Sequence, residues 1–130
     1  MKRITILLAE DHMIVREGFR KMLELEADLE VVGEAQEGRQ AVVLAKKLHP
    51  DVVLMDIAMP QLNGLEATRQ IRKDGRWKAL PIVAMTAHAM TGDKERCLEA
   101  GMTGYISKPV HAAHLIATVE EILGKKSLAG

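Results

Sequence analysis

Acidic, hydroxyl and basic residues follow the short apolar segments of this sequence, at the points where predicted strands end. Glu10 and Asp11 follow the first segment, Asp56 the third, Thr86 the fourth and Lys108 the fifth. Crowded carboxylates repel one another and raise one another's pKa, so such a group is costly unless a cation lies within it. Hard oxygen donors, with no cysteine or clustered histidine beside them, suit Mg²⁺ better than Zn²⁺.

This combination of residue types is equipped for phosphoryl transfer. A metal ion and an ammonium group neutralise charge on the phosphoryl oxygens while a carboxylate attacks phosphorus. Taken one at a time, the residues are ordinary, because an acidic pair after a strand is commonly a solvated turn and Lys108 a surface charge. Their chemistry therefore depends on whether the fold brings them to one place.

The elements that must position these residues alternate along the chain. Predicted strands span residues 4–9, 31–35, 52–55, 82–85 and 104–107. They are apolar throughout rather than alternating, which indicates strands buried on both faces of a parallel sheet. With right-handed crossovers and a doubly wound order, the ligand site lies at the carboxyl ends of the strands. All the residues above then share one sheet edge.

Helical periodicity separates the predicted strands. The apolar positions that share a helix face are Val15, Phe19, Met22 and Leu23 in the first helix, Ala41, Leu44, Ala45 and Leu48 in the second, and Leu115, Ile116, Val119, Ile122 and Leu123 in the last. Segments 65–74 and 91–100 are weaker helix candidates. His49-Pro50 predicts the end of the second helix and Gly101 the end of the fourth.

Composition restricts the class of protein. The 130 residues are 48% hydrophobic and 28% charged, which is typical of one globular domain. Lys and Arg number 18, as do Asp and Glu, whereas a nucleic-acid binder normally carries a basic excess. Asp74 interrupts a group of basic residues, which we interpret as a solvated helix face: Arg69, Arg72, Lys73, Arg76 and Lys78. The single Cys97 and the absence of a membrane-span or signal-peptide pattern predict a cytoplasmic protein.

The order and spacing of several motifs resemble the receiver domains of two-component response regulators. The motifs are Leu8-Ala9-Glu10-Asp11, Val53-Leu54-Met55-Asp56-Ile57-Ala58-Met59-Pro60, Asn63-Gly64, Pro81-Ile82-Val83-Ala84-Met85-Thr86-Ala87, Ala100-Gly101-Met102 and Lys108-Pro109. The resemblance covers roughly residues 3–123. It implies an α/β fold like that of flavodoxin and the chemotaxis regulators: a doubly wound, five-stranded parallel sheet in the order 2-1-3-4-5 with five helices. The receiver domain would span 1–124, and 125–130 would be a polar tail or linker stub.

The resemblance implies a role for each residue at the sheet edge. Asp56 would accept the phosphoryl group as an acyl phosphate. Asp11 and Asp56 would bind Mg²⁺ directly, the backbone carbonyl of Ala58 would be a third ligand, and Glu10 would act through a metal-bound water. Mn²⁺ would be an acceptable substitute for Mg²⁺. Lys108 would pair with the phosphoryl oxygens.

The same resemblance implies a switch. Thr86 would move to hydrogen-bond the phosphoryl group and Tyr105 would rotate inward behind it, since an added phosphate charge biases a bistable element. The surface of helix 91–100, strand 104–107 and helix 111–124 would report the change. Ala58 and His88 would tune the lifetime of the phosphate.

The implied partners are a histidine kinase or histidine phosphotransfer protein, and an output domain or partner protein. A homodimer that forms on phosphorylation is also expected, whereas direct contact with nucleic acid or a membrane is not. The domain would assist phosphorylation and dephosphorylation of its own Asp56 without being a turnover enzyme.

The same residues are compatible with other functions. One is an unphosphorylated pseudo-receiver that serves as a protein-interaction scaffold. Another is a Mg²⁺-dependent phosphohydrolase with Asp56 as nucleophile, although Ala58 stands where such enzymes carry a second aspartate. A nucleotide or flavin binder would need a glycine-rich loop in place of Glu10-Asp11. His12 is interpreted as an exposed residue at a helix start, with metal binding as the alternative.

Overall fold

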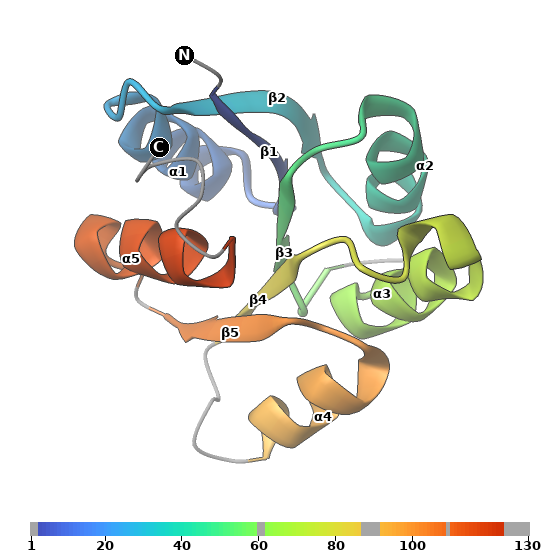
Figure 1. Cartoon of the computed structure of the whole chain (residues 1–130). Coiled ribbons are helices and arrows are strands. Elements are labelled where there is room, and N and C mark those ends of the chain that lie inside the picture. The colour runs from blue at the N-terminus through green and yellow to red at the C-terminus, as the bar shows by residue number, and fades with distance from the viewer. Residues whose placement is uncertain (1–2, 60–61, 87–91, 109, 124–130) are drawn as a thin grey trace.

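The computed structural model describes residues 3–59, 62–86, 92–108 and 110–123. Its five parallel strands lie in the order β2-β1-β3-β4-β5 (Figure 1). Their bounds are β1 Ile4–Ala9, β2 Leu29–Ala35, β3 Val52–Asp56, β4 Ile82–Thr86 and β5 Gly104–Ser107. The doubly wound, flavodoxin-like architecture expected from the sequence is confirmed.

Helices cover both faces of the sheet in the described part of the chain. They are α1 Met13–Glu24, α2 Gly38–Leu48, α3 Gly64–Lys73, α4 Asp93–Ala100 and α5 Ala112–Ile122, with a 3₁₀ turn η1 Gly75–Trp77 after α3. Helices α1 and α5 lie on one face and α2, α3 and α4 on the other (Figure 1). None of the described helices has the length and apolar character needed to cross a bilayer.

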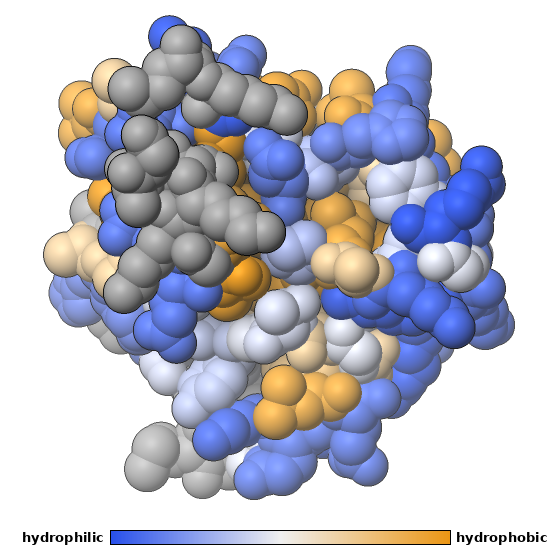
Figure 2. All heavy atoms as spheres, in the orientation of Figure 1, coloured by the Kyte–Doolittle hydropathy of each residue, from blue (hydrophilic) through white to orange (hydrophobic). Residues whose placement is uncertain are grey.

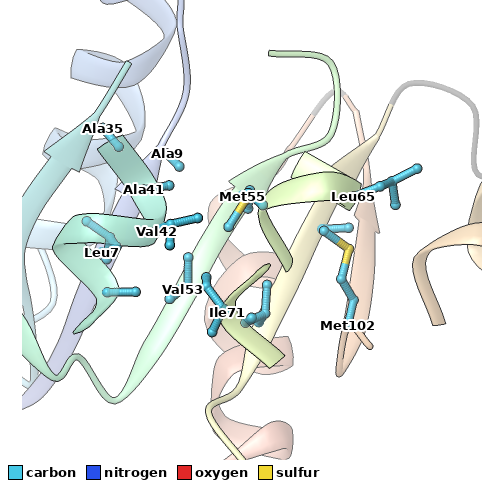
Figure 3. Close-up of a cluster of buried hydrophobic side chains, with 14 of the residues drawn as sticks. Leu7, Ala9, Ala35, Ala41, Val42, Val53, Met55, Leu65, Ile71 and Met102 are labelled. Atoms are coloured by element: carbon cyan, nitrogen blue, oxygen red, sulfur yellow. The ribbon is translucent and has the colours of Figure 1, made fainter. Parts of the chain in front are cut away.

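Two aliphatic clusters form the core, one on each face of the sheet. Along β1, Leu7 and Ala9 face the α2–α4 side, whereas Ile6 and Leu8 face α1 and α5. Figure 3 shows the first cluster, in which strand residues such as Val53 meet residues of α2 and α3. Each fully buried aliphatic side chain contributes about 1.5–3 kcal/mol to folding. Strands β3 and β4 are buried along their whole length, as expected for central parallel strands.

The edge strand β2 differs from the prediction. It begins at Leu29 rather than residue 31, because Leu29 pairs with Ile4 of β1. Most of its side chains are only partly buried, since an edge strand has a neighbour on one side alone. β1 and β5 have the predicted bounds, and β3 and β4 are each one residue longer than predicted, because β3 includes Asp56 and β4 includes Thr86. Asp56 and Thr86 thus belong to the sheet itself, whereas Glu10, Asp11 and Lys108 follow β1 and β5 directly.

The helix ends follow the predicted signals. α2 ends at Leu48, and His49 adopts the left-handed conformation with φ 52° before Pro50. Gly101 takes φ 105° after α4, where a glycine costs least. The last helix ends at Ile122, and residues 124–130, which include the predicted tail, lie outside the described residues.

The predicted buried face of α1 was wrong at one position. Val15 is 40% exposed, and Arg16 is buried in its place with Phe19 and Leu23. The Arg16 guanidinium pairs with Glu34 of β2, with 2.9 Å between Nε and Oε1. A buried charge is tolerated when it is paired and hydrogen-bonded, and this partner comes from a different element.

The outer surface around α3 is hydrophilic. Figure 2 shows mainly hydrophilic residues at the right of this view, where α3 lies in Figure 1. Arg69, Lys73, Arg76 and Lys78 are exposed there. Asp74 offsets part of this basic charge, because its carboxylate pairs with Arg76 at 2.8 Å.

Candidate functional site

The acidic pair begins where β1 leaves the sheet. Glu10 is completely buried, and its backbone N–H still donates to the Ala35 carbonyl of β2 at 3.0 Å. Its carboxylate Oε2 accepts a hydrogen bond from the His12 backbone N–H at 3.0 Å. Nη1 of Arg16 donates to the Glu10 carbonyl at 2.9 Å. The turn that carries Glu10 and Asp11 is therefore held from both sides.

The carboxylate of Asp56, at the end of β3, is held by two donors. The side chain is buried, with 2% exposed. Its Oδ1 accepts from the Ala58 backbone N–H at 2.9 Å, and its Oδ2 accepts from the Lys108 ammonium at 2.8 Å. Both oxygens therefore have a fixed orientation at the carboxyl edge of the sheet.

Lys108 joins the ends of three strands. Its Nζ lies 2.8 Å from Asp56 Oδ2 and 3.8 Å from Glu10 Oε1. Its backbone N–H donates to the Thr86 carbonyl at 2.7 Å, which ties the segment after β5 to the end of β4. Thr86 itself is buried, with 1% exposed. The fold thus brings Glu10, Asp56, Thr86 and Lys108 to one edge, as the strand arrangement predicts.

The electrostatics of this edge favour a cation. Burial, together with hydrogen-bonding and charge interactions with Asp56 and Asp11, raises the pKa of Glu10 to about 7, although the His12 backbone N–H opposes the shift. Within the described residues, Glu10 Oε1 and Asp11 Oδ1 are buried oxygens that accept no hydrogen bond. These oxygens fit a hard divalent ion such as Mg²⁺, which takes oxygen ligands.

Comparison with known proteins identifies the family. A family model described as "Response regulator receiver domain" matches residues 6–120. The chain belongs to the response regulator receiver domains. Phosphorylation-controlled signalling, rather than classical enzyme turnover, is the general role of this family.

Individual receivers match almost the whole chain. The polar-differentiation response regulator DivK of Brucella ovis is 36% identical over 120 residues, which cover 92% of this chain and 96% of that protein. A LuxR-family two-component response regulator from Aurantimonas sp. has 38% identity and a TM-score of 0.86, covering 95% of this chain and 87% of that chain. The receiver domain of the sensor histidine kinase PA1611 of Pseudomonas aeruginosa PAO1 has 37% identity and a TM-score of 0.85, covering 94% of this chain and 98% of that chain. Its crystal structure has a magnesium ion coordinated in the active site cleft.

The remaining predicted positions of the receiver are spread around the edge. Ala58 is exposed, and its backbone N–H contacts Asp56 as described. Tyr105 of β5 is half-buried, with the Lys94 ammonium 5.7 Å from its ring centre. Tyr105 lines a surface hollow together with His114 and other residues of α5. His88 lies outside the described residues.

Two supporting residues were missed from the sequence. Arg16 was not predicted to be a site residue, because a charged residue is normally placed on the solvent face of a helix. Its closeness in sequence to Glu10 and Asp11 was the signal that could have indicated its role. Gly64 appeared in a motif, but its physical role was not recognised. The glycine begins α3 directly after the Asn63 N-cap and packs against the backbone that carries Asp56.

We expect Gly64→Ala to destabilise the receiver by about 1–3 kcal/mol, the usual cost of overpacking. A Cβ at this position would lie 2.6 Å from the Asp56 carbonyl oxygen and 2.8 Å from the Ile57 Cα. Gly18→Ala is the matched control, because Gly18 is in the exposed part of α1 with nothing within 4 Å of the added carbon. It should stabilise the domain slightly through better helix propensity. Urea unfolding of both variants checks the prediction, and equal stabilities would contradict it.

Proposed function

We propose that this receiver takes up a phosphoryl group on Asp56 in a Mg²⁺-dependent reaction. The observation that carries the proposal is the buried Asp56 carboxylate, held by Lys108 and the Ala58 N–H beside the Glu10–Asp11 turn. An Asp56 oxygen attacks phosphorus, and the bond from phosphorus to the donor atom breaks. The bonding electron pair stays with that donor atom, and the product is an acyl phosphate.

The donor would be a histidine kinase, a histidine phosphotransfer protein or a small phosphodonor such as acetyl phosphate. Lys108 Nζ already lies 2.8 Å from Asp56 Oδ2, so the ammonium is placed to pair with oxygens of the incoming phosphoryl group. The ammonium reduces the electrostatic repulsion between the negative Asp56 carboxylate and the negative phosphoryl group.

Four residues would hold the ion. Asp11 and Asp56 are proposed as direct ligands, with the Ala58 carbonyl as a third and Glu10 acting through water. The buried oxygens of Glu10 and Asp11 that accept no hydrogen bond in the described structure support this set. When bound, Mg²⁺ supplies neutralisation of the phosphoryl charge, and Mn²⁺ should substitute for it. The magnesium ion in the Pseudomonas neighbour is consistent with this assignment.

The phosphate would then act as a switch. We propose that Thr86 moves to hydrogen-bond it, that Tyr105 rotates inward, and that the surface of α4, β5 and α5 passes the change to an output domain, a partner protein or a second copy of the receiver. Ala58 and His88 are proposed to set the lifetime of the phosphate. The single Cys97 supports placing this exchange in the cytoplasm.

The direct test is intact-protein mass after incubation with acetyl phosphate and Mg²⁺. We expect a gain of one phosphoryl group that a chelator prevents. If no gain is seen, beryllofluoride binding distinguishes the explanations. Binding would indicate a short-lived phosphate, whereas no binding would overturn the proposal in favour of an unphosphorylated scaffold.

Lys108→Ala should separate metal binding from switching. We expect the Mg²⁺ dissociation constant to change by less than about tenfold, because Lys108 is not a proposed metal ligand. The chemical-shift change of Tyr105 on addition of beryllofluoride and Mg²⁺ should be largely lost, since the phosphoryl mimic loses its cationic partner. Exposed Lys78→Ala is the matched control and should respond like the unaltered receiver. A normal response in Lys108→Ala would show that the proposed role of this lysine is wrong.

A further inference from the structure

His12 turns towards the acidic pair although it begins a helix. It is the N-cap residue of α1, yet its side chain makes no capping hydrogen bond. The imidazole is 72% exposed, and its Nδ1 lies 3.3 Å from Glu10 Oε2 and 3.3 Å from Asp11 Oδ1. The ring therefore adds a nitrogen atom to an edge that otherwise presents oxygen ligands.

The His12 nitrogen lies at metal-ligand spacing from both carboxylates. One ligand atom from each of Glu10, Asp11 and His12 lies within 4.8 Å of the others. In a tetrahedral Zn²⁺ site with bonds of about 2.0–2.2 Å, neighbouring ligand atoms are about 3.3–3.6 Å apart. Both contacts of the His12 nitrogen match that separation.

The carboxylates of Glu10 and Asp11 each have one buried oxygen that accepts no hydrogen bond from the described residues. The Glu10 side chain is 0% exposed, and its Oε2, the oxygen nearest the imidazole, also accepts from the His12 backbone N–H. Its Oε1 accepts no hydrogen bond from the described residues and lies 3.8 Å from the Lys108 ammonium. Asp11 Oδ1, the oxygen nearest the imidazole, is likewise buried and without a hydrogen bond in the described structure. Arg16 fixes the turn by donating to the Glu10 carbonyl, so the group does not have to assemble from a mobile loop.

We propose that Glu10, Asp11 and His12 bind a transition-metal ion of the Zn²⁺ class, and bind it more tightly than Mg²⁺. Imidazole nitrogen suits Zn²⁺, Ni²⁺ and Cu²⁺, whereas Mg²⁺ prefers oxygen ligands alone. Three protein ligands leave the fourth position of a tetrahedral ion to water.

This site has a consequence for phosphorylation, and that consequence rests on the function proposed above. Asp11 is shared between the Zn²⁺ set and the proposed Mg²⁺ set, so one ion excludes the other. Zn²⁺ should therefore lower phosphoryl uptake in the presence of Mg²⁺, and His12→Gln should relieve the inhibition.

Metal titrations of the metal-free protein test the ligand set directly. Zn²⁺ binding is followed by competition with a chromophoric chelator, and Mg²⁺ binding by calorimetry. We expect His12→Gln to weaken Zn²⁺ binding by at least about tenfold, the lower end of what loss of even a supporting residue costs a metal site. Mg²⁺ binding should be unaffected. Asp56→Asn should show the reverse pattern, with Mg²⁺ binding weakened and Zn²⁺ binding retained.

Another exposed histidine provides the matched control. His114→Gln on α5 should bind Zn²⁺ like the unaltered protein. Nitrogen NMR of the imidazoles should show the His12 Nδ1 resonance shifting on addition of Zn²⁺. The inference is overturned if His12→Gln retains full Zn²⁺ affinity, if His114→Gln or Asp56→Asn loses as much, or if Zn²⁺ binds no more tightly than Mg²⁺.

These outcomes are distinguishable from failure of the proposed function. Phosphoryl uptake with Mg²⁺ alone is measured in the absence of Zn²⁺ and does not involve His12. A protein that binds Zn²⁺ through His12 but takes up no phosphoryl group supports the site and overturns the phosphoacceptor. A protein that takes up a phosphoryl group but shows no His12-dependent Zn²⁺ binding supports the phosphoacceptor and overturns the Zn²⁺ site. The imidazole would then serve only as a hydrogen-bond donor to the carboxylates.

Discussion

Asp56→Asn is expected to take up no phosphoryl group from acetyl phosphate and Mg²⁺, whereas the unaltered receiver gains one. The amide has the shape of the carboxylate, and its oxygen can still accept from the Ala58 N–H that now contacts Oδ1. It carries no negative charge, however, so it is a poor nucleophile and a poor metal ligand. Loss of uptake therefore reports on chemistry rather than on unfolding, and intact-protein mass measures it.

A second aspartate supplies the control for this variant. Asp74 lies in the turn after α3, at the edge of the sheet opposite the site, and pairs with Arg76. Asp74→Asn should be phosphorylated like the unaltered receiver. Circular dichroism should show both variants folded. Uptake by Asp56→Asn would contradict the assignment and direct attention to Asp11 or Glu10 as acceptors.

Glu10→Gln is expected to make the metal-free receiver more stable at pH 8. In the folded chain the pKa of Glu10 is raised from the ordinary 4.5 to about 7, mainly because the carboxyl is buried and lies beside Asp56 and Asp11. The folded state therefore holds the proton more tightly than the unfolded state does. The contribution of Glu10 to the free energy of unfolding is therefore greatest below about pH 4.5, falls as the pH rises towards about 7, and is level above that, with a total loss of up to about 3 kcal/mol.

A glutamine removes this dependence on pH. Its amide carries no charge, can accept from the His12 N–H through its oxygen and can donate to the Asp56 carboxylate through its nitrogen. Lys108, 3.8 Å from Glu10 Oε1, offsets part of the carboxylate charge and makes the figure above an upper value.

Urea unfolding in the presence of a chelator, at several pH values between 5 and 8, measures this effect. The stability of the unaltered receiver should fall relative to that of Glu10→Gln as the pH rises. Glu66→Gln is the control, because Glu66 is exposed and pairs with Arg69 on the surface of α3. If the free energy of unfolding depended on pH in the same way for Glu10→Gln and the unaltered receiver, the pKa of Glu10 would not be raised in the folded state. Added Mg²⁺ should stabilise the unaltered receiver more than Glu10→Gln, since the ion offsets the carboxylate charge.

Much of the fold followed from the sequence because parallel strands buried on both faces leave a recognisable pattern. Continuous apolar segments separated by helical periodicity predicted β1, β3, β4 and β5 to within one residue. The edge strand β2 was less well predicted, because its exposure depends on which strands lie beside it. Val15 was predicted to be buried, but Arg16 is buried instead, for a similar reason. Helical periodicity fits either residue on the buried face, and the Glu34 carboxylate that pairs with Arg16 lies on a different element.

The placement of Glu10, Asp56, Thr86 and Lys108 at one edge could be predicted from the sequence, because each ends or directly follows a strand and the strands are parallel. The distances at this edge, of Lys108 from Asp56 and of His12 from Glu10 and Asp11, became known only from the three-dimensional packing. The raised pKa of Glu10 and the close packing of Gly64 behind Asp56 also emerged only there. The physical reason is that periodicity is a local property of a few neighbouring residues. Burial, pairing and charge repulsion depend on residues that approach one another across strands.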